Sequence, residues 1–506
     1  MKIFKITAAI LLCLVLAASF IACSEEQNKQ QDPTNPLPEN QEGGIEAAAA
    51  EETDPYAPDL PKNDMAGKTF TLLTYTGWGG DTSASDISGE EQTGDPIQDA
   101  AYNRRVKLEQ QYNCKIKVVN PVDHTETVTN YRTAILAGDT SYDFAITPCA
   151  NFTSLLTGNF LTDFKQLTYI DVDKPYWNKN FYDTMSLVGR NYALDGDISR
   201  RNLECVWIMA FNKGLLRDNG FDSPYDMVKD GSWTYFKMHE MARSAASDLN
   251  GDGKMDETDL WGLNYTGDTI MGIINSVGVR IAKTNSDGIP ELTIATEVNL
   301  EKMYRIYTDM RNDEYSIDTL FRFWIGDVDI FADNRALFLA CASHNISHDA
   351  SEGATNTNSL RAMDVDFGII PYPKWDEAQT EYTPFTAGNY HPVLTIPQTN
   401  YDLENTGILL EAMAYEGMKY MKPAFYENLL KTKTARDDES ADMIDFIFGN
   451  LNYDVGNMFN FDGITGEFGY SMSTNKRANI VSVIEKNEGK WQRAIDKLIE
   501  EIEKHD

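Results

Sequence analysis

Residues 189–213 read GRNYALDGDISRRNLECVWIMAFNK, and this stretch predicts a connection between two folded units. Asn191 to Leu194 has the pattern of an extended segment, and Asp195-Gly196-Asp197 supplies the residues of a bend. Val206 to Phe211 is an apolar run of the length of a buried strand, and a helix is expected to begin at Asn212. We interpret this order of extended segment, bend, strand and helix as a hinge.

The composition sets the size and the chemistry of the protein. The 506 residues are 42% hydrophobic and 24% charged, which is enough material for two or three cores. The net charge of -34 repels phosphate backbones and anionic lipid headgroups. We therefore expect no nucleic-acid partner, and we expect a monomer.

The N-terminus has the features of an export signal. Lys2 and Lys5 precede an apolar run from Ile6 to Ile21, and Ala22-Cys23 resembles the cleavage site of a bacterial lipoprotein. Residues 1–22 are then the signal peptide, and a lipid on Cys23 anchors the protein to the membrane at the cell surface or in the periplasm. A plain secretory signal is the alternative.

A polar segment and a folded body follow the signal. Residues 23–65 are rich in Glu, Gln, Asn, Pro and Ala, which predicts a disordered acidic tether. Beyond the signal, no segment approaches the ~20 apolar residues of a spanning helix. Strands expected at 68–75, 115–119 and 143–147 alternate with a helix capped by Asp95 and another around 131–137. This alternation predicts a largely parallel sheet with helices on both faces, an α/β fold.

Several stretches together resemble one protein family, the extracellular solute-binding proteins (family 1, carbohydrate type) of ABC importers. The stretches that carry the resemblance are Arg190 to Leu194, Phe211 to Gly220, Gly231 to Phe236, Ala336 to Ala340, Asp366 to Lys374 and Gly388 to Pro397. Their order and spacing cover nearly the whole predicted body.

The resemblance implies a fold and a function. The fold is α/β and two-lobed, periplasmic-binding-protein-like of type II, with hinge crossovers near 189–205 and 385–397. The first lobe would comprise 66–190 with 398–435, and the second 191–397 with 436–506. The protein would not be an enzyme, but would capture a carbohydrate, in particular an oligosaccharide, and deliver it to an ABC transporter permease. A peptide or another solute stays open as the ligand.

Two other functions remain as alternatives to solute binding. One is a surface glycoside hydrolase or other carbohydrate-active lipoprotein, and the other is a structural or adhesive lipoprotein. The abundance of acidic residues does not favour the hydrolase, because a carboxylate pair is always available among 78 of them. No G-x-S-x-G, H-E-x-x-H or Walker sequence is present.

Candidate ligand-binding residues follow the ends of predicted strands. Sugars stack their C–H faces on aromatic rings while polar side chains bind their hydroxyls. In open α/β sheets the ligand lies beyond the carboxyl ends of the strands. These rules select Trp78, Asp81, Asn151, Trp207, His344, Asn345, Asn389 and Tyr390. A purely structural role is the alternative for each of them, and Trp233, Trp261 and Trp491 are expected in the core.

Residues 248–259, DLNGDGKMDETD, fit the twelve-residue calcium loop. Oxygen ligands would come from Asp248, Asn250, Asp252, Asp256 and Asp259 and from the carbonyl of Lys254. Gly253 stands where the loop turns sharply. The sequence therefore predicts one structural calcium ion, with a metal-free acidic loop as the alternative.

The cysteines and histidines suggest no catalytic centre. Cys114, Cys149, Cys205 and Cys341 have no C-x-x-C spacing, so buried thiols are expected, with a disulfide left open. His344 and His348 have the spacing of one helix face, but the polar residues around them favour a loop.

Overall fold

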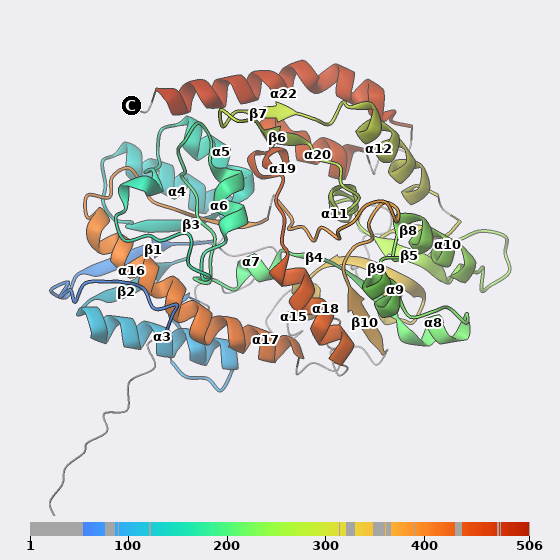
Figure 1. Ribbon diagram of the computed structural model, residues 1–506, viewed down its shortest axis with the longest axis horizontal. Helices are drawn as coiled ribbons and strands as arrows, with labels where there is room; N and C mark the ends of the chain where they lie inside the picture. Colours follow the sequence, from blue (N-terminus) through green and yellow to red (C-terminus); the bar gives the residue numbers. More distant parts are fainter. Residues whose placement is uncertain are drawn as a thin grey trace, which may run out of the picture. The chain divides into compact units, whose positions relative to one another are not determined.

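Two β-sheets organise the chain in a computed structural model (Figure 1). The structure describes residues 54–75, 87–89, 91–120, 123–312, 314–319, 329–347, 360, 366–388, 390–430, 438–472, 475 and 477–504. No helix in these ranges is both long enough and apolar enough to cross a membrane.

The first sheet has the order β2-β1-β3-β11. Its strands are β1 (Thr69–Leu73), β2 (Lys115–Val119), β3 (Phe144–Pro148) and β11 (Pro392–Thr395). β1 is parallel to β2 and β3, whereas β11 is antiparallel to β3, with Pro392 opposite Pro148. The predicted parallel arrangement is confirmed for the three N-terminal strands, and a strand from the returning chain completes the sheet.

The second sheet has the order β10-β4-β9-β5-β8. Its strands are β4 (Trp207–Asn212), β5 (Trp261–Tyr265), β8 (Ser316–Asp318), β9 (Ala336–Ala342) and β10 (Phe367–Ile370). β5 is parallel to β8 and β9, and β4 is antiparallel to β9 and β10. A hairpin of β6 (Ala282–Thr284) and β7 (Pro290–Leu292) stands apart from both sheets.

Helices and short turns connect these strands. The α-helices are α3 (Pro96–Tyr112), α4 (His124–Leu136), α5 (Cys149–Thr157), α6 (Lys179–Met185), α7 (Arg201–Glu204), α8 (Lys213–Asp218), α9 (Pro224–Asp230), α10 (Tyr235–Ala245), α11 (Thr269–Ser276), α12 (Glu297–Met310), α14 (Asp329–Ala332), α15 (His344–Ser347), α16 (Leu403–Glu416), α17 (Lys422–Leu430), α18 (Asp438–Gly449), α19 (Val455–Phe459), α20 (Ile464–Gly466) and α22 (Ile480–Glu503). Shorter helical turns are η1 (Phe164–Gln166), η3 (Gly417–Met421), η4 (Phe461–Gly463) and η5 (Glu467–Ser471).

The alternation of side chains along β1 and β3 separates two cores. Phe70 and Ile146 face a core that includes residues of α3 and α16, whereas Leu73 and Ala145 face residues of α4 and α5 on the other side. Figure 1 shows these helix pairs on opposite faces of the first sheet. The predicted covering of both faces by helices is confirmed.

Local sequence signals account for several element boundaries. Asp95 caps α3 as predicted, since its carboxylate accepts the N–H groups of Ile97 and Gln98. The C-terminal helix α22 buries its apolar stripe and packs against α5 and α12. Trp233, Trp261 and Trp491 are each 0% exposed, so their assignment to the core is confirmed.

The connection at 189–213 differs from its prediction in two respects. Asn191 to Leu194 forms no ladder strand, and only Leu194 makes a bridge, to Leu394. The backbone N–H of Asn191 instead donates to Asp163 Oδ1 at 3.2 Å, and that of Ala193 donates to Asn191 Oδ1 at 3.0 Å, so bonds to side chains compete with strand pairing. The short helix α7 was not predicted and precedes β4.

Residues 54–65, the last part of the predicted tether, lie against the first sheet's helices. The Asp54 carboxylate accepts the hydroxyl of Tyr415 at 2.6 Å and lies 3.3 Å from the Lys419 ammonium. Met65 is buried, and its N–H donates to the Tyr112 carbonyl at 2.8 Å. The chain is thus fastened to α16 from Asp54 onward.

Candidate ligand-binding site

Polar and aromatic residues of the first sheet gather where β1 and β3 end. Tyr75 follows β1, and Cys149 and Asn151 follow β3 at the start of α5. β11 runs antiparallel to β3, so its first residues meet the end of β3, and the Cys149 N–H donates to the His391 carbonyl at 2.9 Å. The returning connection therefore reaches the same edge of the sheet as Asn151.

The second sheet presents a comparable edge. β5 and β9 end there and β4 begins there, with Trp207 opposite Ala342. The Ser343 N–H donates to the Val206 carbonyl at 2.8 Å, which places the start of α15, with His344 and Asn345, beside the start of β4. The loop after β5 reaches Asp268 immediately before α11.

Tyr390 connects the two edges. Its hydroxyl donates to Asp268 Oδ2 at 2.9 Å, on the second sheet's side. Its backbone carbonyl accepts the hydroxyl of Tyr75 at 3.4 Å and the thiol of Cys205 at 3.5 Å. A residue of the returning connection thus contacts the end of β1, the first connection and the loop after β5.

The charged groups at this junction are mostly buried. Burial raises the pKa of the Asp268 carboxyl, and the hydrogen bond from Tyr390 opposes the shift. The Arg201 guanidinium lies 4.9 Å from the centre of the Tyr75 ring. Glu204 lies 3.1 Å from Arg200 in an ion pair. Asp268 is thus a half-buried carboxylate that binds a neutral tyrosine, whereas the buried Glu204 is paired with Arg200.

Among the buried polar atoms without a hydrogen-bond partner in the described part of the chain, three belong to residues that were predicted for the site. They are Oδ1 of Asn151, Oδ1 of Asn345 and Nε1 of Trp207. Leaving a buried polar atom unpaired costs about 1–3 kcal/mol, so each such atom calls for an explanation. Hydroxyl groups of a ligand would satisfy all three, because a hydroxyl both donates to an amide oxygen and accepts from an indole N–H.

Five of the eight residues predicted for the site lie at the sheet edges described above: Asn151 in α5 after β3, Trp207 at the start of β4, the exposed His344 and Asn345 in α15 after β9, and Tyr390 just before β11. Trp78, Asp81 and Asn389 lie outside the described residues. Trp207 is only 6% exposed, and its ring packs so closely on α11 that a Cβ on Gly272 would lie 2.8 Å from it. It is therefore a core residue with an unpaired N–H.

Tyr75, Arg201 and Asp268 were not predicted for this site. Tyr75 was assigned to the strand, although the observed β1 ends two residues earlier. Asp268 lies in Thr266-Gly267-Asp268, a polar turn after a strand, and this pattern could have identified it. Arg201 belongs to α7, which the sequence pattern did not indicate.

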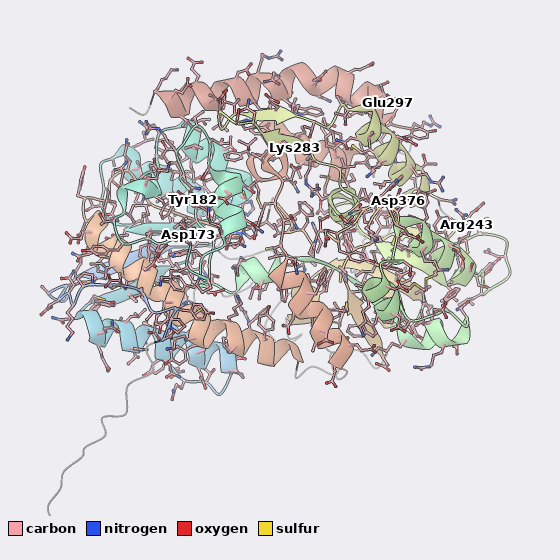
Figure 2. All side chains as sticks on the ribbon, in the orientation of Figure 1. Asp173, Tyr182, Arg243, Lys283, Glu297 and Asp376 are labelled. Carbon is pink, nitrogen blue, oxygen red and sulfur yellow. The ribbon has the colours of Figure 1, made fainter. Side chains whose placement is uncertain are left out.

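One hollow among the described residues lies away from these sheet edges. It measures about 520 Å³ and is lined by Lys302, Trp375 and Asp376, the last labelled in Figure 2. The Trp375 ring already stacks on Tyr235 at 5.3 Å and packs against Phe236 at 4.8 Å. Tyr235 therefore covers one face of the Trp375 ring, and the Lys302 ammonium lies over the ring at 5.3 Å from its centre. A second hollow of about 20 Å³, beside Asp195 and Asn202, has room for one water molecule only.

The predicted calcium loop lies between α10 and β5, where Ser247 and Leu260 close its neck through backbone bonds of 2.9 and 3.1 Å. Its carboxylates bind the loop's own backbone: Asp248 accepts from Gly251 and Gly253, and Asp259 accepts from Leu249 and Asp256. Within the described ranges, no three His, Cys, Asp or Glu side chains form a group able to hold a metal ion. Calcium binding would require these carboxylates to turn inward, and it stays a prediction.

The four cysteines of the body are free thiols. Cys114, Cys149 and Cys341 are buried, and Cys205 is half-buried. Burial raises the pKa of the Cys114 thiol to about 11. The expectation of thiols is confirmed, and these residues are not paired with one another.

Two sheets of this order, joined by connections that meet at their edges, define a periplasmic-binding-protein-like α/β fold, the class found in solute-binding proteins. No protein-family model and no curated protein sequence matches the chain. Many solved structures match its fold.

Three of these structures illustrate the range of similar proteins. UgpB of Mycobacterium tuberculosis, in complex with glycerophosphocholine, has a TM-score of 0.55 and 12% identity, covering 86% of this chain and 99% of its own. An ABC substrate-binding protein of Listeria monocytogenes, in complex with cycloalternan, has a TM-score of 0.53 with the same identity and coverages. A sugar transporter of Rhizobium etli, in an open conformation, has a TM-score of 0.53 and 14% identity, with the same coverages. At these identities the likeness establishes the fold, which confirms the predicted class.

Proposed function

We propose that this chain is an extracytoplasmic solute-binding protein that captures a carbohydrate, in particular an oligosaccharide, and delivers it to an ABC transporter permease. The observation that carries the proposal is the set of unpartnered polar atoms on Asn151, Asn345 and Trp207, at sheet edges that Tyr390 connects. A polyhydroxylated ligand supplies both the donors and the acceptors that these atoms lack.

The remaining chemistry of the junction fits the same class of ligand. Asp268 accepts a hydrogen bond from Tyr390 at one carboxylate oxygen, and carboxylate oxygens can accept further bonds from sugar hydroxyls. The half-buried Tyr390 supplies aromatic surface, which is the usual platform for the apolar faces of sugars. Several similar structures contain saccharides, among them cyclo/maltodextrin-binding protein with maltotetraose.

Export and anchoring complete the proposal. Lipidation of Cys23 would hold the protein on the outer side of a membrane, and the following polar residues would act as the tether. Because Asp54 is bound to Tyr415 of α16, the tether would join the folded body next to the helices of the first sheet. The permease partner is inferred from the class of fold.

A ligand screen tests the function. The full mature chain is screened by thermal shift against maltotriose, maltotetraose, cycloalternan and glycerophosphocholine, and each mixture is then analysed for hydrolysis products. A ligand at 100 times its dissociation constant adds about 2.7 kcal/mol to the stability, which a melting curve detects. We expect a saccharide to raise the melting temperature without product formation.

Each other outcome of the screen has a distinct meaning. Product formation from a saccharide would replace this proposal with the glycoside hydrolase. A shift with glycerophosphocholine alone would keep solute binding but remove the carbohydrate. No shift with any compound on a folded protein would favour the structural or adhesive surface protein.

A further inference from the structure

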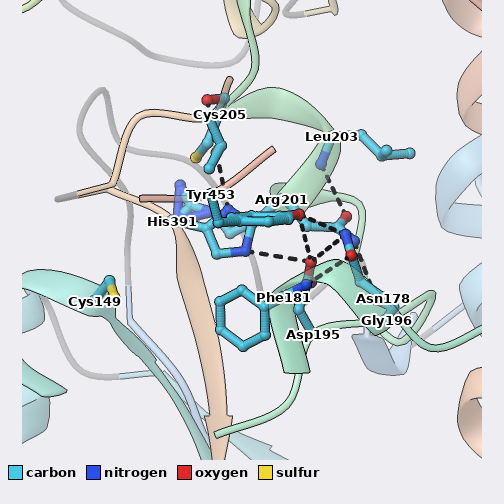
Figure 3. Close-up of polar contacts among 12 residues, drawn as sticks. Cys149, Asn178, Phe181, Asp195, Gly196, Arg201, Leu203, Cys205, His391 and Tyr453 are labelled. Atoms are coloured by element: carbon cyan, nitrogen blue, oxygen red, sulfur yellow. Dashed lines mark hydrogen bonds and ion pairs between the residues drawn. The ribbon is translucent and has the colours of Figure 1, made fainter. Parts of the chain in front are cut away.

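A buried cluster of polar and aromatic side chains surrounds the Asp195 carboxylate (Figure 3). Asp195 Oδ2 accepts the amide N–H of Asn178 at 3.2 Å and the hydroxyl of Tyr453 at 3.3 Å. Nε2 of His391 lies 3.3 Å from the same oxygen, near enough for an ion pair but not aligned for a hydrogen bond. Three groups therefore converge on one carboxylate oxygen.

The other atoms of these side chains are also held in place. The Thr386 hydroxyl donates its single proton to the Cys205 carbonyl at 3.0 Å, so Nδ1–H of His391 donates to Thr386 Oγ1 at 2.9 Å. The Asn178 amide oxygen accepts the Phe181 N–H and caps α6. The Phe181 ring packs against the rings of His391 and Tyr453, at 5.2 and 5.3 Å between centres.

The members of this cluster come from different connections of the chain. Asn178 and Asp195 lie on the path from the first sheet toward the second, before α7. His391 lies on the return path, just before β11. Tyr453 lies in the segment after α18, a helix that packs on β10 of the second sheet. If any one of these three segments moved, a contact of Asp195, or a contact of a residue that binds Asp195, would change.

We propose that Asp195 is a positioning residue for ligand capture, which fastens these connections to one another so that any movement of one sheet edge relative to the other involves all of them together. The inference rests on the proposed function, because it assigns the cluster the task of holding Tyr390, the neighbour of His391, in contact with both edges. Asp195 itself contacts none of the ligand-binding residues named above in any described bond.

Hydrogen exchange of the ligand-free full chain, measured by mass spectrometry, tests the proposal independently of any ligand. Asp195→Asn keeps the size of the side chain but removes its charge. It also introduces an N–H donor next to Asn178 and Tyr453, which themselves donate to Asp195 in the wild type. We expect exchange to accelerate by about tenfold or more in three peptides together, those covering 178–195, 385–391 and 450–455. Peptides of β1 and β2 should keep their wild-type rates.

Matched variants separate this role from a general loss of stability. Tyr453→Phe removes one donor and keeps the ring, so it should accelerate the same three peptides by a smaller factor. The controls Asp183→Asn and Tyr182→Phe change the same residue types on α6, where Asp183 forms an exposed ion pair with Lys179. Neither control should alter the exchange of 385–391 or 450–455.

Exchange that accelerates only in the peptide containing residue 195, with 385–391 and 450–455 unchanged, would overturn the proposal. If Asp195→Asn does not fold, Tyr453→Phe decides in the same way. The proposal also fails if a control variant accelerates the three peptides as strongly as Asp195→Asn. Since no ligand is present, these results do not depend on whether the chain binds a carbohydrate.

Discussion

Trp207 is held in the sheet and yet has an N–H without a partner in the described part of the chain. We expect Trp207→Phe to keep most of the packing on α11 but to lose this donor. A hydrogen bond is worth about 0.5–1.5 kcal/mol, so the affinity for the bound saccharide should fall by roughly threefold to tenfold. Calorimetry of the wild type and the variant measures the change.

Trp491→Phe is the control for this substitution. The Trp491 Nε1 also lacks a partner among the described residues, but this ring of α22 lies in the core beside Phe468 of η5. The control should alter the melting temperature and leave the affinity unchanged. Equal affinities for wild type and Trp207→Phe would remove Trp207 from the site.

Asp197 should make the stability of the fold depend on pH. Burial raises its pKa to about 6, while Lys422, 3.7 Å away, opposes the shift. The folded state thus binds the proton more tightly than the unfolded chain, in which the pKa of this carboxyl is near 3.8. Protonation of Asp197 therefore stabilises the fold as the pH falls from about 6 to about 4.

Urea denaturation at several pH values measures this effect. The free energy of unfolding of the wild type minus that of Asp197→Asn should rise by on the order of 1–3 kcal/mol between pH 7 and pH 4, at about 1.4 kcal/mol per pKa unit. Lys422→Met should move the transition to higher pH. A difference that stays constant over this range would contradict the assignment.

The site residues show what a sequence pattern can and cannot locate. Asn151 and Trp207 were predicted because the rule about strand ends depends only on where strands begin and stop. Asp268 and Arg201 act through contacts with Tyr390 and Tyr75, which are distant in sequence. Contacts between residues so distant in sequence cannot be predicted from a single sequence, because they depend on how both sheets pack.

Elements with strong local signals were predicted well. β2 spans Lys115–Val119 as expected, and α3 begins at Pro96, directly after its predicted cap Asp95. The connection at 191–206 was predicted less well, since α7 has only four residues and the backbone N–H groups of Asn191 and Ala193 donate to side chains instead of to a neighbouring strand. Short irregular segments depend on tertiary hydrogen bonds more than on propensity.

The loop at 248–259 gives a prediction at the level of one element. If it binds calcium, the ion should raise the melting temperature and a chelator should lower it, because the bound ion stabilises only the folded loop. Asp252→Ala should abolish this sensitivity, whereas Asp287→Ala in the β6–β7 turn should keep it. Dialysed protein without calcium, together with no chelator effect on melting, would end the prediction.

The predicted lipid anchor on Cys23 would determine where the whole protein is located. We expect Cys23→Ser to release the protein from membranes into the medium, because the thioether can no longer form. Fractionation followed by immunoblotting measures the distribution, with Cys114→Ser as a control that should stay with the membrane. Retention of Cys23→Ser at the membrane would refute the anchor.

The arrangement of two sheets around shared connections explains why residues from 75 to 390 meet at one place. The order of the family-like stretches predicted the fold class, and the similar structures confirm it. The ligand could not be predicted, since similar folds hold cycloalternan in one protein and glycerophosphocholine in another. The fold class does not determine which side chains lie at the sheet edges, so it does not determine which ligand is bound.

Isothermal titration calorimetry of the mature chain with the best saccharide from the screen tests the central claim most directly. We predict one saccharide bound per chain, with affinity lowered roughly tenfold or more in Asn151→Ala and Asn345→Ala, since each loses a buried acceptor for a ligand hydroxyl. Asn487→Ala on α22 is the control and should bind like the wild type. Full affinity in both edge variants, or no saccharide binding by the folded protein, would contradict the account.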